Sequence, residues 1–126
     1  MAYIPADAEW YLADVVIEIQ VEGHPESIVH TNTMLIRAGS PEEAYEKALK
    51  LGEASEMEHQ NIVGSKVTFR FRGLRDLNVI HDKLEDGSEL VYHEQSVTDK
   101  HAITRWVTPK GQLAVFAPIE PSQGPD

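Results

Sequence analysis

The stretch Ser40-Pro-Glu-Glu-Ala-Tyr-Glu-Lys-Ala-Leu-Lys-Leu-Gly52 is the one strong helix signal in a chain otherwise patterned for β-strands. Ser40 is a favoured N-cap residue, and Glu43 three positions later completes a capping box. Apolar side chains recur along one face at helical spacing, at Ala44, Tyr45, Ala48, Leu49 and Leu51. We expect Gly52 just past the end of the helix, as its C′ residue. The pattern leaves open whether Glu53–His59 adds further turns.

Two strands are expected before this helix. From Trp10 to Glu22 apolar residues alternate with mostly polar ones, which is typical of a strand with one buried face. Ser27 to Arg37 is rich in Thr, Val and Ile and carries apolar residues on both faces. The turn residues 23–26 between them predict an antiparallel hairpin.

Two more strands are expected after the helix. Ser65 to Arg72 alternates again, with Val67, Phe69 and Phe71 on the face predicted to be buried, and Gly73 is expected to end it. Leu74–Leu84 is read as a loop or one short helical turn. Asp86-Gly87 is a turn signal, and Glu89–Val97 is predicted to form the fourth strand.

These elements predict an α+β fold: an antiparallel sheet of four or more strands in β-β-α-β-β order, with one main helix on one face. Residues 103–107 and 112–117 flank the turn Thr108-Pro-Lys-Gly111, which predicts a C-terminal β-hairpin within residues 99–117. A single domain over residues 1–117 follows from the length of 126 residues. The proline-rich residues 118–126 predict a disordered tail.

Composition excludes several classes of function. The chain has no cysteine, so disulfides, thiolate metal sites and cysteine nucleophiles are excluded. Its net charge of −10 disfavours binding to nucleic acid and to anionic membranes. The N-terminus lacks the features of a signal peptide, and no apolar run approaches the ~20 residues of a membrane span. We therefore expect a cytoplasmic protein.

No motif of catalysis or metal binding is present. The six histidines show neither HxH nor HExxH spacing, no serine lies in a G-x-S-x-G elbow, and no glycine-rich phosphate loop occurs. We therefore predict no catalytic residues, no metal ligands and no cofactor. Polar residues do lie close together along the chain near the expected fourth strand, and these are the candidates for a ligand site: Asp82, Tyr92, His93 and Glu94.

Basic residues gather at Lys66–Arg75, interleaved with aromatic ones as in some RNA-binding sheets. Because successive side chains of a strand point to opposite faces, however, Phe69 and Phe71 lie on the face opposite the arginines. Strand 10–22 carries Asp14, Glu18 and Glu22 on its own polar face, where they would meet Lys66, Arg70 and Arg72. We therefore predict cross-strand ion pairs between these two strands rather than a nucleic-acid surface.

The order and spacing of several short motifs resemble a bacterial family called domain of unknown function 4288. The resemblance covers Trp10 to about Thr98. Its motifs are Trp10-Tyr11-x-Ala13, Glu42-Glu43-Ala44 with Lys47-Ala48 and Gly52, Phe71-x-Gly73-Leu74-x-Asp76-Leu77, and Asp86-Gly87-x-Glu89-Leu90. It implies a compact bacterial domain of uncharacterised activity and supplies no catalytic residues.

Three hypotheses of function remain. One helix cannot cover both faces of a sheet, so the first is a non-catalytic, self-associating interaction module, with a dimer favoured. Either face of the sheet or the segment from residue 103 to 116 could form the contact, and the candidate interface residues are Ile103, Trp106, Val115 and Phe116. The second is a small-molecule or metal-binding enzyme with a site near the fourth strand. The third is an acidic regulatory domain that binds a basic protein.

Overall fold

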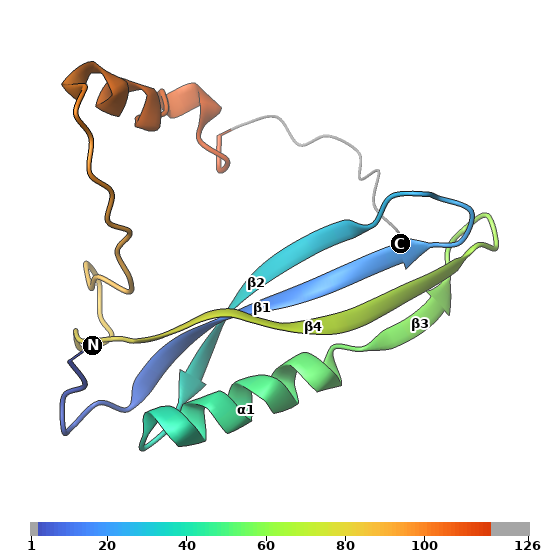
Figure 1. Cartoon of the computed structure of the whole chain (residues 1–126), viewed down its shortest axis with the longest axis horizontal. Helices are drawn as coiled ribbons and strands as arrows, with labels where there is room; N and C mark the ends of the chain where they lie inside the picture. The colour runs from blue at the N-terminus through green and yellow to red at the C-terminus, as the bar shows by residue number, and fades with distance from the viewer. Residues whose placement is uncertain (1–2, 117–126) are drawn as a thin grey trace. The chain divides into compact units, whose positions relative to one another are not determined.

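The computed structural model describes residues 3–116 (Figure 1). Described residues up to Tyr92 form one compact unit, and those from His93 onward belong to a second, so each unit is described by itself. The first contains β1 (Trp10–Val21), β2 (Ile28–Arg37), α1 (Pro41–Ala54), β3 (Met57–Gln60) and β4 (Lys66–Val79). This confirms the predicted α+β class. The β-β-α-β-β order is matched only roughly, because the two strands after the helix are not the two that were predicted.

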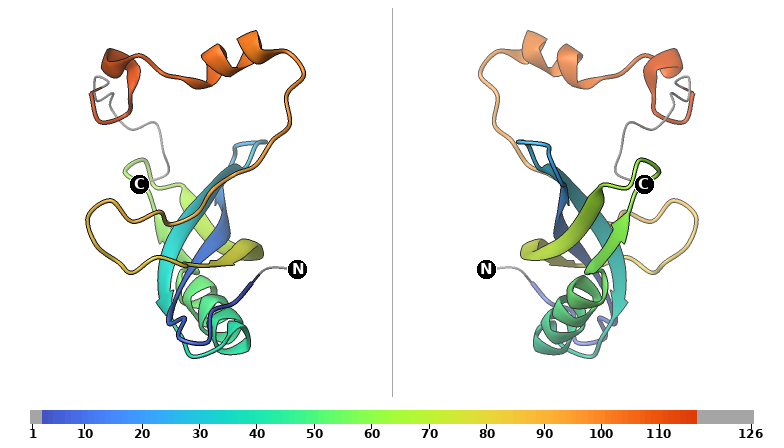
Figure 2. Two further views of the ribbon diagram at one scale, coloured as in Figure 1. Left: turned by 90° about the vertical axis from the view of Figure 1, so that its left-hand side faces the viewer. Right: turned by 90° about the vertical axis from the view of Figure 1, so that its right-hand side faces the viewer.

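The four strands form one antiparallel sheet in the order β2-β1-β4-β3. The long strands β1 and β4 lie at the centre, and β2 and β3 form the two edges. Because β2 and β3 follow one another in the chain but lie at opposite edges, α1 must cross the sheet to connect them. Figures 1 and 2 show that it does so along one face of the twisted sheet, so the first unit, as described, has no helix on the other face.

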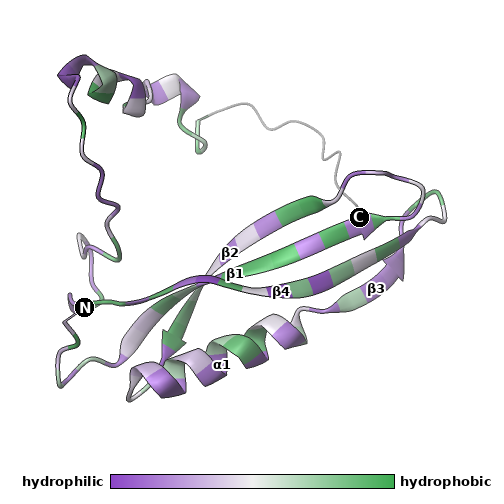
Figure 3. Ribbon diagram, in the orientation of Figure 1, coloured by the Kyte–Doolittle hydropathy of each residue, from purple (hydrophilic) through white to green (hydrophobic). Residues whose placement is uncertain are grey.

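The core lies between α1 and one face of the sheet. Every second residue of β1 points toward this face. In Figure 3, β1 is largely hydrophobic, with hydrophilic residues at intervals along it. Its buried side chains there are Tyr11, Ala13, Val15, Ile17 and Ile19. Ala44 and Ala48 of α1 and Val67 of β4 close the core, and Phe69 and Phe71 pack at its margin. Each large aliphatic side chain buried in this way contributes roughly 1.5–3 kcal/mol. The predicted inward faces of both strands are confirmed.

The predicted capping arrangement is present, except that Glu43 bonds the N–H of Gly39 rather than that of the N-cap residue Ser40. The Ser40 hydroxyl accepts a hydrogen bond from the Glu43 N–H at 3.1 Å, and the Glu43 carboxylate accepts one from the Gly39 N–H at 2.8 Å. The prediction that Gly52 follows the helix is wrong, because α1 continues to Ala54. Gly52 instead lies buried within the helix, where a Cβ atom would overlap the ring of Phe71.

The strand predicted to end at Gly73 runs on to Val79. Two register shifts against β1 make this possible: Ile17 lies opposite Phe71 but Val16 opposite Gly73, which leaves Arg72 as an extra residue. A second shift leaves Arg75 as an extra residue between the partners of Val15 and Asp14. These β-bulges keep apolar side chains on the core face although their spacing is no longer two. Gly73 has a φ of 131°, a region that glycine adopts readily.

The strand predicted at Glu89–Val97 does not form. β3 forms the remaining edge of the sheet. It comes largely from the segment for which the sequence left open a continuation of the helix. Met57–Gln60 pairs with Phe69–Lys66 of β4. A strand needs a neighbour with free backbone groups, and β3 occupies the edge of β4 that was open.

The second unit contains two short 3₁₀ helices, η1 (Lys100–Trp106) and η2 (Lys110–Gln112), so the predicted C-terminal hairpin is wrong. Asp99 begins η1 as its N-cap, since its carboxylate accepts a hydrogen bond from the His101 N–H at 3.0 Å. The single domain predicted over residues 1–117 stays a prediction. The tail predicted at residues 118–126 lies outside the described residues.

Candidate functional site

A groove follows the outer edge of β2, where it faces α1. It has a volume of about 390 Å³ and is lined by Leu35, Ile36, Arg37, Lys47, Lys50 and Leu51. The lining includes three cationic residues and two exposed leucines, since Leu35 is 50% exposed and Leu51 is 38% exposed. The sequence did not reveal this groove, because no pattern in β2 tells that it lies at an edge beside the helix.

Two of these cations have partners within the first unit. The Arg37 guanidinium pairs with the Glu9 carboxylate at 3.0 Å and lies 5.6 Å from the centre of the Trp10 ring. The Lys47 ammonium donates a hydrogen bond to the backbone carbonyl of Arg37 at 2.6 Å. This contact holds α1 against the end of β2. The Lys50 ammonium takes part in no hydrogen bond or ion pair among residues 3–116.

The face of the sheet opposite α1 is polar at its centre. Glu18 accepts hydrogen bonds from Arg72 at 3.2 Å and from the Ser27 hydroxyl at 2.6 Å. This is one of the cross-strand ion pairs predicted between the strand at residues 10–22 and the strand that begins at residue 65. Lys66, in contrast, pairs with Glu58 of β3 at 3.5 Å. These exposed pairs have ordinary structural roles.

A second concave region lies at one end of the sheet, where β1 begins and β4 has ended. It has a volume of about 500 Å³ and is lined by Pro5, Asp7, Ala8, Glu9, Trp10 and residues 80–84. The ring of His81 stacks on that of Tyr3, with centroids 6.2 Å apart and planes 8° apart. The Ile80 N–H donates to the Trp10 carbonyl at 2.9 Å, which continues the pairing of β4 with β1.

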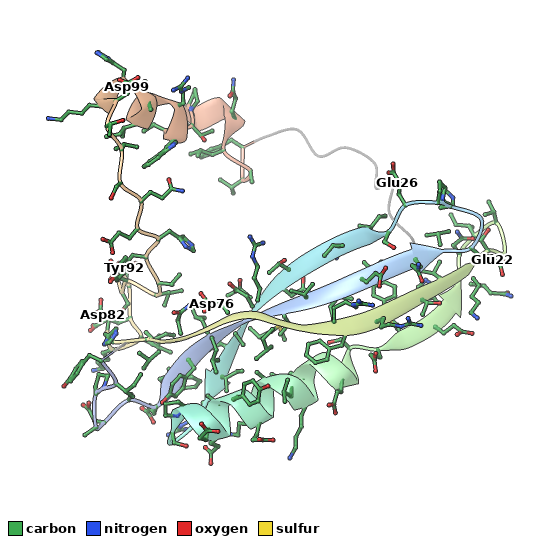
Figure 4. All side chains as sticks on the ribbon, in the orientation of Figure 1. Glu22, Glu26, Asp76, Asp82, Tyr92 and Asp99 are labelled. Carbon is green, nitrogen blue, oxygen red and sulfur yellow. The ribbon has the colours of Figure 1, made fainter. Side chains whose placement is uncertain are left out.

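The polar residues predicted as a ligand site divide between the two units. Asp82 lines the 500 Å³ cleft, and its carboxylate accepts a hydrogen bond from the Glu89 N–H at 3.0 Å, so it organises the loop after β4. Tyr92 is exposed at the end of the same segment (Figure 4). His93 and Glu94 are exposed residues of the second unit. The strand that was expected to bring the four together is absent.

The predicted interface residues all lie in the second unit. Ile103 and Trp106 are on η1, while Val115 and Phe116 follow η2. All four are exposed, Trp106 and Phe116 at 54% each. Among residues 93–116 none is buried, and Ala102 alone is partly buried. This short segment therefore carries its large apolar side chains without a core of its own.

Within residues 3–116, no group of three or more His, Asp or Glu side chains is placed to hold a metal ion. No helix in that part of the chain has the length and apolar character needed to cross a bilayer.

Comparison with known proteins identifies one relationship. The sequence profile of the family described as "Domain of unknown function (DUF4288)" matches residues 10–92. The match covers all five helices and strands of the first unit and ends where that unit ends. No curated protein and no solved structure matches the sequence.

Proposed function

The chain belongs to the family described as a domain of unknown function (DUF4288), and we propose from its own surfaces that it is a self-associating interaction module without catalytic activity. In this proposal the family core at residues 10–92 supplies a stable scaffold. The segment at residues 93–116 supplies the contact with a second copy.

The observation that carries the proposal is the exposed apolar surface of residues 93–116. The large apolar side chains in that segment, each at least 37% exposed, are Val97, Ile103, Trp106, Val107, Leu113, Val115 and Phe116. Soluble proteins rarely leave such side chains gathered in contact with water unless they bind something. Short 3₁₀ helices also have little stability of their own, so their order depends on contacts.

A second copy of the chain is the proposed occupant. Most soluble oligomers are homo-oligomers, and the commonest are two-fold dimers. Trp and Phe are enriched at the centres of interfaces, where few residues carry most of the binding free energy. We expect Trp106 and Phe116 to have that role, with Ile103 and Val115 beside them.

Light scattering after size-exclusion chromatography tests the proposal. At tens of micromolar the wild type should be a dimer and the double variant Trp106→Ala/Phe116→Ala a monomer. The matched control Thr104→Ala/Thr108→Ala changes two exposed residues of the same segment and should stay dimeric. Because none of the four side chains is buried, unfolding of the first unit by urea should be the same in both variants. A control that dissociates as readily as the aromatic variant would contradict the proposal.

Small-molecule binding is a second candidate, favoured by the cleft that Asp82 lines. Its volume of about 500 Å³ lies in the range of ligand pockets, and its lining includes Asp7, His81 and Lys83 beside apolar groups. Thermal unfolding of the chain in the presence of a metabolite and metal panel tests this candidate. An increase in melting temperature that Asp82→Asn does not alter would place the ligand elsewhere.

A further inference from the structure

We propose that the groove between β2 and α1 binds an extended acidic segment of another protein, which adds to the sheet as a strand beside β2. This inference does not depend on self-association through residues 93–116. It concerns a different surface, formed within the family core by Leu35, Lys47, Lys50 and their neighbours.

The backbone of β2 presents free hydrogen-bonding groups to this groove. In an antiparallel pair, residues alternate between those that bond their neighbour and those whose N–H and C=O point away from it. The Ala38 N–H donates to the Glu9 carbonyl at 2.9 Å, so Ala38 faces β1. By alternation Arg37, Leu35 and Thr33 face outward. The Lys47 ammonium reaches the Arg37 carbonyl from the groove, as this alternation requires.

β2 is the edge better suited to accept a strand. It is 10 residues long, contains no proline, and lies at the margin of the sheet. Proteins usually protect such edges, because the unpaired backbone groups are a template for another strand. The opposite edge, β3, is only 4 residues long, and its Glu58 pairs with Lys66.

The charge of the groove specifies an acidic partner. The chain has 11 basic residues against 21 acidic ones, yet three of the basic residues line this one groove. Arg37 is paired with Glu9, so the ammonium of Lys50 is the charge there without a counter-charge among the described residues. The two lysines are spaced to pair with Glu43 and Glu46 one turn earlier, but neither ion pair forms among the described residues. Glu43 is held instead in the capping box. Carboxylates on a bound strand would supply the missing counter-charge.

Pairing between the β2 strands of two copies would not supply this counter-charge. β2 reads Ile-Val-His-Thr-Asn-Thr-Met-Leu-Ile-Arg and contains no carboxylate. In a dimer formed along this edge, the paired β2 strand itself would bring no carboxylate to Lys50. We therefore assign the groove to a different protein segment. Such a segment would alternate acidic side chains, facing α1, with apolar ones, facing the exposed Leu35.

A labelled, end-blocked peptide, Thr-Glu-Val-Glu-Val-Glu-Thr, is the probe for this site, and fluorescence polarisation measures its affinity for the full chain. A peptide with Gln in place of each Glu is its neutral counterpart. We expect the acidic peptide to bind about tenfold more tightly at low ionic strength. Lys50→Glu should weaken binding about fivefold or more, whereas Lys83→Glu, which makes the same charge change outside the groove, should have less than about a twofold effect.

Backbone hydrogen exchange tests the mode of binding. On addition of the acidic peptide, the Thr33 and Leu35 amides should exchange more slowly, because they now donate to the added strand. The proposal would be overturned if the two peptides bound equally tightly or if both lysine variants lost the same affinity for the acidic peptide. Protection from exchange confined to β3 would also overturn it. So would a dimer that Lys50→Glu converts to monomers, since the groove would then hold a second copy. A urea midpoint equal to that of the wild type shows that each variant is folded.

Discussion

Gly52 of α1 lies against the ring of Phe71 of β4, so closely that the Cβ atom of any other residue would overlap that ring. Gly52 is buried in the middle of a helical turn, where glycine is a poor helix former. The contact explains why glycine stands there. It sets the distance between the helix and the central strands, and therefore positions the whole α1 layer on the sheet.

The first prediction is that Gly52→Ala destabilises the fold. Alanine favours the helix by about 1 kcal/mol, but its methyl group must displace the Phe71 ring, and overpacking of this kind typically costs about 1–3 kcal/mol. Urea unfolding should show a net loss. Gly39→Ala is the control, because a Cβ at Gly39 meets no atom within 4 Å.

A double-mutant cycle separates this contact from helix propensity. Phe71→Leu removes part of the ring, so Gly52→Ala should be tolerated better in that background than in the wild type. The two substitutions should therefore be non-additive by about 0.5 kcal/mol or more. Additive effects would mean that the two residues do not constrain one another.

The second prediction concerns the bulge at Gly73. Because φ there is 131°, Gly73→Ala should cost about 1–3 kcal/mol through backbone strain, although a Cβ at this position meets no atom within 4 Å. The same measurement of unfolding applies. A stability equal to that of the wild type would argue against the bulged path of β4.

The third prediction concerns the Glu18–Arg72 pair. Glu18→Gln should lower the free energy of unfolding by at most about 1 kcal/mol, because Arg72 is largely exposed. Salt should reduce the difference between variant and wild type. Glu26→Gln, an exposed carboxylate in the turn before β2, is the control and should have no measurable effect. A difference unchanged by salt would indicate that the hydrogen bond from Ser27, rather than charge, stabilises Glu18.

The fourth prediction concerns the helix cap. Ser40→Ala removes the acceptor for the Glu43 N–H and should cost about 1 kcal/mol. Ser96→Ala, at an exposed position of the second unit, serves as the control. If both serines can be replaced without loss of stability, the capping box does not fix the start of α1.

The sequence was sufficient where one local pattern determines the structure. The capping box of Ser40 and Glu43 located the start of the helix, and strict alternation located β1 and the first half of β4. The prediction failed after Phe71, because the bulges at Arg72 and Arg75 change the spacing of the core-facing residues from two to three. A search for strict alternation cannot follow a strand through such positions.

Elsewhere the outcome depended on partners that the local pattern does not reveal. Glu89–Val97 has residues suited to a strand, but β3 takes the open edge of β4. Asp99 is a favourable N-cap and could have indicated the helical start at Lys100. The prediction of a ligand site assumed a strand that does not form. The basic groove could not be predicted because it exists only where β2 lies at the edge of the sheet.

Sedimentation equilibrium of the wild-type chain over a range of concentrations tests the central claim most directly. Self-association predicts a mass that rises to twice the 14.1 kDa of one chain at tens of micromolar and falls on dilution. A mass that stays at that of one chain throughout would contradict the account.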